Sequence, residues 1–284
     1  MINLARSITD LLADLPAQHA LCAFNIETFT MARAAFRAAS QTQCPVVLAY
    51  SQPAAQALGY LHTAQLVALA GEAFPDVPYA LHLDHCHNHA ELHAAIAEGF
   101  TSANFLNEGD LEPDAYLTAA RELRTQLGTG VSLEFVSGRL GHIDHAVPAP
   151  AAATTTVEQI VAFAQACRPD ILGFDHGSVH GMRVRTRHLD LDLIRGVAEA
   201  TTLPQVLHGS SGVLPNEIRA GIDAGLRKIN IETALRTTYM NTIRTAVIGA
   251  SDTARKPRLL ELELEQAMTS QFVALLTDYT LRKA

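Results

Sequence analysis

Short apolar runs alternate with longer amphipathic segments along the whole chain. Eight of these runs have the length and composition of buried strands: ALCAFNI (20–26), PVVLAYS (45–51), YALHLDH (79–85), SANFL (102–106), VSLEFV (131–136), ILGFD (171–175), PQVLHG (204–209) and LRKINI (226–231). Between them, segments such as 90–100, 113–127 and 216–226 carry apolar residues at helical spacing. Strict alternation of strand and helix predicts parallel strands joined by right-handed crossovers.

Eight strand–helix units in 284 residues favour a closed (β/α)8 TIM barrel, which typically takes roughly 250 residues. An open doubly wound sheet would give the same linear pattern and is the alternative. We expect one barrel domain over 1–284, with an N-terminal amphipathic helix within 1–15 and extra C-terminal helices over 233–248 and 258–278. A Gly/Pro/Ala-rich lid loop is expected at about 138–155, and a second long loop at 176–189.

Composition narrows the class of protein. With 48% hydrophobic and 18% charged residues the chain can bury a large core, which excludes disorder as its main state. A net charge of −8 argues against nucleic acid or an anionic membrane as a partner. There is no signal-peptide core and no long apolar run, so we expect a cytoplasmic protein. Four scattered cysteines without a C-x-x-C pair are expected to be reduced core thiols: Cys22, Cys44, Cys86 and Cys167.

Polar side chains close nearly every predicted strand. In a parallel barrel the active site gathers at the carboxyl ends of the strands, so these positions are candidate site residues. They are Asn25, Ser51, Asp84, His85, Glu134, His208 and Asn230, with His180 following the sixth strand.

Three of these residues, His85, His180 and His208, suggest a metal site. Three neutral imidazoles with one open position are typical of catalytic zinc. A single histidine is more often held by a hydrogen bond in a core or loop, and other histidines crowd the region after the third strand. The H-x3-H pair of His176 and His180 lacks the glutamate of a metalloprotease helix and is interrupted by glycine.

A phosphate site is predicted beside these histidines. The small-residue turn HGSSG (208–212) leads from the seventh strand into a helix that begins near Pro215. Backbone N–H groups in such a turn favour an anion, although the turn alone is usually just a tight connection. Thr233 lies in the neighbouring loop, and the last two strands of these barrels commonly supply phosphate sites.

The chain resembles the class II, zinc-dependent ketose-bisphosphate aldolases of the fructose- and tagatose-bisphosphate group. The resemblance covers most of the chain and rests on motifs in family order, of which HLDH with LHG-x-SG is the specific combination. The motifs are AFN (23–25), HLDH (82–85), GFTS (99–102), SLEF with two following glycines (132–141), VHGM (179–182), LPQVLHGSSG (203–212) and AGLRKIN-x-ET (224–233).

The resemblance implies cleavage of a ketose phosphate to dihydroxyacetone phosphate and an aldehyde. It implies one zinc ion per subunit on His85, His180 and His208, a monovalent cation as a further candidate, and Asp84 as the acid/base. The small-molecule partner is a sugar phosphate, and the assembly is a homodimer or homotetramer. Further implied contacts, with Ser51 added from its place at a strand end, are Asn25, Gly181, Gly209, Ser211, Asn230 and Thr233.

The predicted site requires an irregular backbone at one position, and the sequence differs from the family pattern at several others. Asp84 and His85 are adjacent, so in a regular strand they would point to opposite faces, and the chain must leave strand geometry there. Leu106 and Val136 stand where the family has carboxylates, and Ala115 replaces an expected asparagine. The lid reads GHIDH (141–145), which makes Asp144 the candidate proton carrier, with His142 and His145 as alternatives.

These departures suit an altered substrate or a loss of activity. Two alternatives therefore stand beside the aldolase: a non-catalytic metal-binding member, and a metal-dependent hydrolase that uses Asp84 as base. The phosphate turn argues against the hydrolase. Arg183, Arg185 and Arg187 are candidates for a second anionic group, although a solvated loop is their more ordinary role.

Overall fold

Eight parallel strands close into a barrel in the computed structural model, which describes residues 5–107, 111–138, 140–142, 155–182, 184–248 and 256–281. The order around the barrel is β1-β10-β9-β7-β5-β4-β3-β2. Each strand falls within or overlaps one of the eight apolar runs, so the TIM barrel prediction is confirmed. The strands are β1 (Leu21–Asn25), β2 (Val46–Ser51), β3 (Tyr79–Cys86), β4 (Ser102–Phe105), β5 (Ser132–Ser137), β7 (Ile171–Phe174), β9 (Gln205–Leu207) and β10 (Leu226–Ile231).

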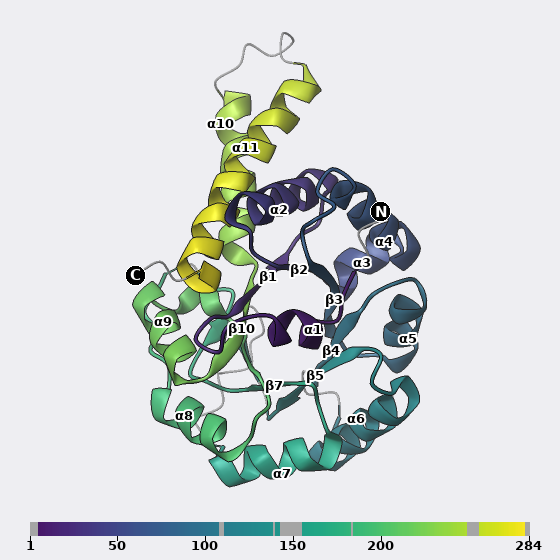
Figure 1. The fold of residues 1–284 in the computed structure, drawn as a ribbon, viewed down its shortest axis with the longest axis vertical. Coiled ribbons are helices and arrows are strands. Elements are labelled where there is room, and N and C mark those ends of the chain that lie inside the picture. The colour runs from purple at the N-terminus through teal and green to yellow at the C-terminus, as the bar shows by residue number, and fades with distance from the viewer. Residues whose placement is uncertain are drawn as a thin grey trace.

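A ring of helices surrounds the barrel (Figure 1). Several of these helices are preceded by a residue whose side chain accepts a hydrogen bond from a backbone N–H of the first turn, as Thr28 does before α2 and Asp190 before α8. The helices are α2 (Phe29–Thr42), α3 (Gln52–Leu58), α4 (Tyr60–Gly71), α5 (His89–Ala97), α6 (Pro113–Leu127), α7 (Val157–Cys167), α8 (Leu191–Ala200) and α9 (Pro215–Ala224).

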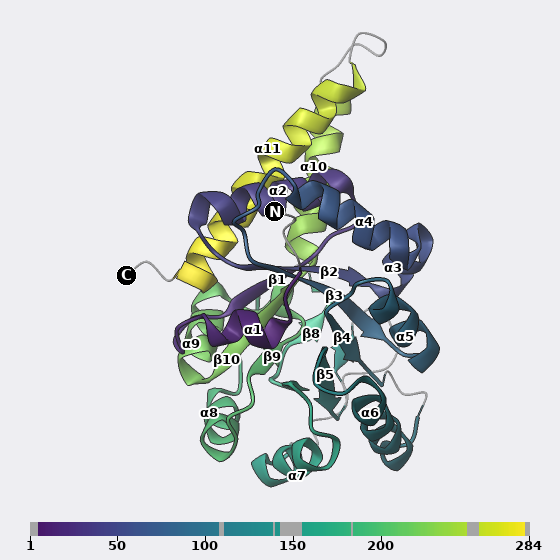
Figure 2. The same cartoon turned by 45° about the vertical axis from the view of Figure 1, so that its right-hand side comes forward.

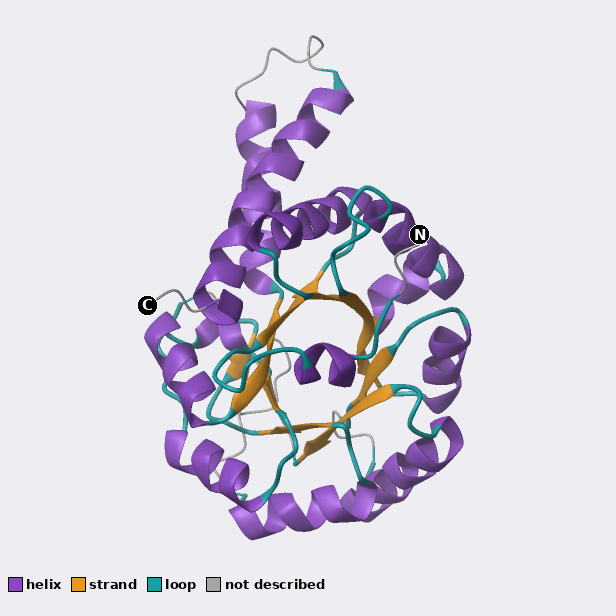
Figure 3. Ribbon diagram, in the orientation of Figure 1, coloured by secondary structure: helices purple, strands orange, loops and turns teal. Residues whose placement is uncertain are grey.

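A short N-terminal helix, α1 (Ile8–Ala13), lies across one open end of the barrel (Figure 3). It is shorter than the helix expected within 1–15. Its side chains Ile8, Leu11 and Leu12 pack against Leu21, Val47 and other apolar residues at the amino ends of the strands. This end is therefore sealed by an apolar layer, which leaves the opposite end of the barrel for a site.

Two long C-terminal helices, α10 (Thr233–Ile248) and α11 (Pro257–Leu275), run side by side and project beyond the barrel (Figure 2). The chain then continues through a π-helical turn, Leu276–Leu281. An ion pair between Arg37 of α2 and Glu265 of α11, 2.7 Å between nitrogen and oxygen, ties the second helix to the ring. Across the described residues, no helix has both the length and the apolar character that a membrane span requires.

A second, two-stranded sheet extends the loops after β5 and β7. There β6 (Gly141–His142) pairs in parallel with β8 (Val179–His180). Most of the predicted lid, including Asp144 and His145, lies outside the described residues. The four cysteines are free and buried, as predicted.

Candidate metal and phosphate site

One cavity of about 380 Å³ opens at the carboxyl ends of the strands. It brings together the site residues predicted from the sequence, apart from Glu134, which does not line the cavity, and Asp144, which lies outside the described residues. The predicted residues on its wall are Asn25, Ser51, Asp84, His85, His180, Gly181, His208, Gly209, Ser211, Asn230 and Thr233.

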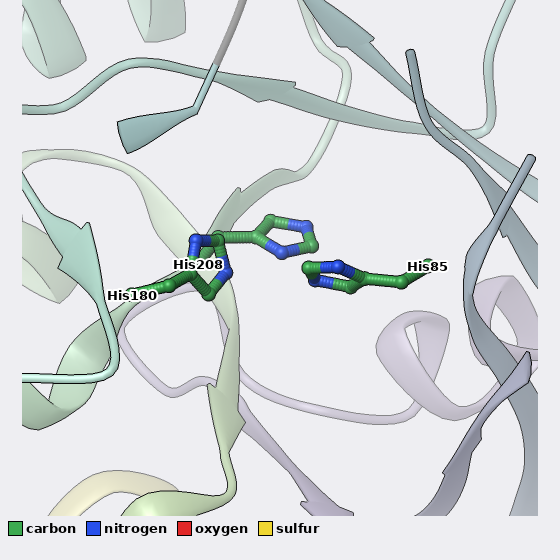
Figure 4. A group of neighbouring side chains, drawn as sticks. All are labelled: His85, His180 and His208. Carbon is green, nitrogen blue, oxygen red and sulfur yellow. The ribbon is translucent and has the colours of Figure 1, made fainter. Parts of the chain in front are cut away.

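Three histidine rings converge in this cavity from β3, β8 and the end of β9 (Figure 4). Their centroids are 5.0 Å apart for His85 and His180, 5.4 Å for His85 and His208, and 5.6 Å for His180 and His208. One nitrogen from each ring lies within 4.8 Å of the other two. Three such nitrogens could hold a metal ion and leave further coordination positions for a substrate.

The backbone at His85 is irregular, as it must be if the adjacent side chains of Asp84 and His85 are both to face the site. Its φ angle is +54°, in the left-handed region that a residue with a side chain rarely adopts, and the pairing of β3 with β4 shifts register between Leu83 and Cys86. The amide of His85 donates to Oδ1 of Asn104 at 3.3 Å. The chain thus leaves strand geometry between Asp84 and His85, and both side chains reach the cavity. Strain of this kind is typical of functional sites.

Glu134 orients the third histidine. Its Oε1 lies 2.7 Å from Nε2 of His208, and both side chains are buried. Because a carboxylate only accepts, Nε2 of His208 carries the proton and Nδ1 is the nitrogen with a lone pair to offer. A carboxylate behind a metal-binding histidine sets both tautomer and ring orientation. The hydroxyl of Ser178 donates to the carbonyl oxygen of His208 at 2.6 Å and holds the backbone as well.

A charged layer lies in the barrel interior below the histidines, where such barrels usually pack branched apolar side chains. The ammonium of Lys228 lies 2.6 Å from Oε2 of Glu134 and 3.2 Å from Nε2 of His82, whose Nδ1 is 2.7 Å from the hydroxyl of Ser102. All four residues are fully buried. The spacing of His82, Asp84 and Glu134 would also suit a metal ion, but Lys228 already contacts two of them.

Burial and the neighbouring charges determine the pKa values of the side chains in this layer. Burial alone would raise the pKa of Glu134, but Lys228 and His208 outweigh it and hold that pKa at about 2. Burial, reinforced by Lys228, lowers the pKa of His82 to about 3, so this ring is neutral. The layer therefore contains one carboxylate, one ammonium and one neutral imidazole.

Asp84 is held as a carboxylate at the floor of the cavity. Its Oδ2 accepts from Nδ2 of Asn25 at 2.8 Å and its Oδ1 from Nδ2 of Asn230 at 3.4 Å. Oδ2 lies 4.0 Å from Nε2 of His85. Burial acts to raise the pKa of Asp84, but His85 and His208 outweigh it and the pKa lies well below its usual range.

The loops after β9 and β10 lie together on one wall of the cavity, where the sequence predicts an anion site. Gly209 has a φ of +64°, and a Cβ atom there would lie 2.8 Å from the carbonyl carbon of Val179. This close approach lets the turn Ser210–Gly212 fold over the cavity, and the hydroxyl of Ser210 donates to the carbonyl oxygen of Asn230 at 2.6 Å. Thr233 begins α10 beside it. The turn and the first residue of α10 thus line one cavity wall, and backbone N–H groups at such places favour an anion.

Sequence reasoning missed several residues of the site. Arg236, Glu232, Glu27 and His87 also line the cavity, and Lys228 supports it from below. Two signals were present: Arg236 follows Thr233 by three residues and so shares its helix face, and Lys228 precedes Asn230 by two and so shares its strand face.

The arginines proposed for a second anionic group are placed differently. The guanidinium of Arg185 donates to the carbonyl oxygen of Val213 at 3.0 Å, and neither Arg185 nor Arg187 lines the cavity. Arg183 lies outside the described residues. Leu106 and Val136, which stand where the resemblance implies carboxylates, are buried, and Val136 packs against Gly173.

Comparison with known proteins identifies the family of the chain. The family model for class II fructose-bisphosphate aldolase matches residues 7–280. A fructose-bisphosphate aldolase of Mycoplasma pneumoniae is 30% identical over 80% of this chain and 79% of its own length. A 6-phospho-5-dehydro-2-deoxy-D-gluconate aldolase of Shouchella clausii is 31% identical over 88% and 86%. The crystal structure of the YdjI aldolase from Escherichia coli K12 superposes with a TM-score of 0.81, at 19% identity over 97% of both chains, which supports the fold. With a match over nearly its whole length, the chain belongs to the class II fructose-bisphosphate aldolase family.

Proposed function

We propose that the protein is a zinc-dependent aldolase that reversibly cleaves a ketose phosphate to dihydroxyacetone phosphate and an aldehyde. The observation that carries this proposal is the shared cavity: Asp84, three converging histidines and the anion-binding turn all line it. A substrate with a phosphate in that turn would place its carbonyl near the histidines. The related aldolases act, by their names, on two different phosphorylated compounds, so the family alone does not identify the sugar.

The three histidines fit zinc because each offers one neutral nitrogen and because Glu134 fixes the third ring from behind. Bound there, zinc would polarise the ketone and stabilise the negative charge that develops on it during cleavage. Binding and orientation fall to the chain itself. The N–H groups near Ser211 and Thr233 hold the phosphate, and the amides of Asn25 and Asn230 hold Asp84 in place.

Asp84 performs the first proton transfer. Its carboxylate takes the proton from the hydroxyl one carbon beyond the bond to be broken, and the O–H electrons become the carbonyl of the leaving aldehyde. The carbon–carbon bond breaks and its electron pair passes to the ketone fragment as an enediolate. A general base in this position contributes roughly 10²- to 10⁴-fold to the rate.

A second group must return a proton to the carbon of the enediolate. We assign this step to Asp144 of the predicted lid, with His142 and His145 as alternatives. The assignment has a direct test: Asp144→Ala should slow exchange of the dihydroxyacetone phosphate proton with solvent while cleavage at Asp84 is retained. Unchanged exchange would give the step to another residue.

The main experiment measures release of dihydroxyacetone phosphate from a panel of ketose 1-phosphates and 1,6-bisphosphates, with and without a chelator. Chelator-sensitive release from any member is the expected result. His208→Ala should lose zinc and activity together, and Asp84→Ala should keep zinc but lose turnover. His188→Ala is a matched control, because His188 is exposed and pairs with Glu217 outside the cavity.

Two outcomes would overturn the proposal. An active His208→Ala protein without metal would remove the triad from the reaction. Zinc-loaded protein that is silent across the whole panel would favour a non-catalytic member of the family, in line with the apolar side chains of Leu106 and Val136.

A further inference from the structure

The wall of the cavity near α10 contains an ion pair that the reaction described above does not use. Arg236 is the one arginine or lysine among the described residues that line the cavity. Its Nη1 lies 3.0 Å from Oε1 of Glu232. The other oxygen of the same carboxylate, Oε2, accepts from the hydroxyl of Thr233 at 3.2 Å. The carboxylate of Glu232 thus pairs with two donors, the guanidinium of Arg236 and the hydroxyl of Thr233, on the wall that contains the proposed anion site.

Helix geometry places these donors together. Thr233 is the first residue of α10, and Arg236 lies three residues further along on the same face. The positive end of the helix dipole is at this point, where a phosphate would be favoured. A guanidinium can bind two phosphate oxygens in parallel, and it prefers a dianion to a carboxylate of single charge.

We propose that Arg236 binds the phosphate of the substrate and that Glu232 is a resident carboxylate, which fills the anion site until the phosphate displaces it. The inference rests on the proposed function, since it concerns the same phosphate, and it names the charged residue that selects a phosphate monoester over a neutral sugar. The side chains of both residues are partly exposed, Arg236 by 59% and Glu232 by 38%, so each can rotate when the ligand enters.

The charges account for the selectivity. An entering phosphate dianion would bring two negative charges to Arg236 and to the N–H groups of the turn, whereas Glu232 brings one. A neutral polyol would have to compete with Glu232 without any charge. Glu232 therefore weakens the binding of every ligand at this site, and a phosphate monoester competes with it most effectively.

The test is direct binding of sn-glycerol 3-phosphate, with glycerol as the unphosphorylated comparison, measured by calorimetry on the protein as purified. Arg236→Gln should weaken binding of the phosphate by about 10- to 100-fold, the usual range for a hydrogen bond to a charged group. Arg236→Lys should recover part of the loss. Glu232→Gln should tighten binding by about 2- to 5-fold, as expected for release of an exposed ion pair.

Arg244→Gln is the matched control, because Arg244 is an exposed arginine of the same helix that pairs with Asn241. Its affinity should equal that of the parent protein. Equal affinity of Arg236→Gln and the parent would overturn the role of Arg236 while leaving the aldolase proposal intact. Weaker binding by Glu232→Gln would overturn the role of Glu232 as a displaced anion. If the parent protein binds glycerol as well as its phosphate, the phosphate site itself fails, and the proposed function fails with it.

Discussion

Removal of the charge of Lys228 should strongly lower the free energy of unfolding while changing the shape of the side chain little. In Lys228→Met the ammonium disappears while the apolar stem is approximately preserved. The lysine is fully buried, with its nitrogen 2.6 Å from Oε2 of the equally buried Glu134. Glu134 would retain His208 as its remaining partner.

The magnitude follows from the distance and the burial. At 2.6 Å and an effective dielectric constant of about 20, the attraction between the two charges is roughly 6 kcal/mol. Glu134 can limit this loss by taking up a proton, since burial raises its pKa once Lys228 is absent. We therefore expect the free energy of unfolding to fall by about 3–5 kcal/mol, the usual cost of breaking a buried ion pair from one side.

Loss of the Lys228 charge should also weaken the metal site, which loss of an ordinary packing contact would not do. A protonated Glu134 no longer accepts the N–H of His208 as a carboxylate, so the ring is less well oriented for a metal. Zinc affinity should fall by about 10- to 100-fold, as for other groups that support metal ligands.

Thermal unfolding of the chelator-treated protein tests the stability, and competition with a chromophoric chelator tests the zinc affinity. The unfolding midpoint should fall by about 6 °C or more. Arg195→Met is the control, because its ion pair with Asp192 is exposed and should contribute less than about 1 kcal/mol. If Lys228→Met changes stability as little as the control and leaves zinc affinity unaltered, the charged layer does not support the site.

Three further predictions concern other parts of the molecule. Burial lowers the pKa of His176 to about 3, so the unfolded chain binds the extra proton below pH 6.5 and the free energy of unfolding falls with falling pH, by up to about 1.4 kcal/mol per unit. In metal-free protein His176→Phe should reduce this slope between pH 6.5 and 4 by the contribution of one histidine and leave that of His82, whose pKa is equally low, and an unchanged slope would contradict the assignment. Gly209→Ala should destabilise the turn by about 1–3 kcal/mol because of its φ of +64° and its contact with Val179; Gly130→Ala, where a Cβ would meet nothing within 4 Å, is the control, and equal unfolding midpoints would refute the strain. Burial raises the pKa of Cys22 to about 12, and all four thiols are buried, so a thiol reagent should react slowly with native protein and with four thiols in urea; rapid labelling of the native protein would show that the core opens.

The linear sequence located the eight strands because the barrel is built from a local, repeated pattern, whereas closure into a barrel, and not an open doubly wound sheet, is seen only in the structure. Each strand is an apolar run and each helix has its own periodicity, so eight units could be located without knowledge of their neighbours. The same reasoning located the candidate metal ligands, which line one cavity, since the carboxyl ends of parallel strands converge whatever their separation in sequence. Even the irregular backbone at His85 was predictable, because two adjacent side chains cannot both face inward from a regular strand.

Only the tertiary structure decided which charges meet. Lys228 of β10, Glu134 of β5 and His82 of β3 are far apart in the chain, and closure of the barrel brings them into contact in its interior. Arg236 and Glu232 are close in sequence, but whether they face solvent or the cavity depends on how α10 leaves β10. Pattern reveals which positions are buried, because burial follows local periodicity. The partner of a buried or half-buried charge is set by the three-dimensional path of the chain, and in this protein those partners determine how the site is held and charged.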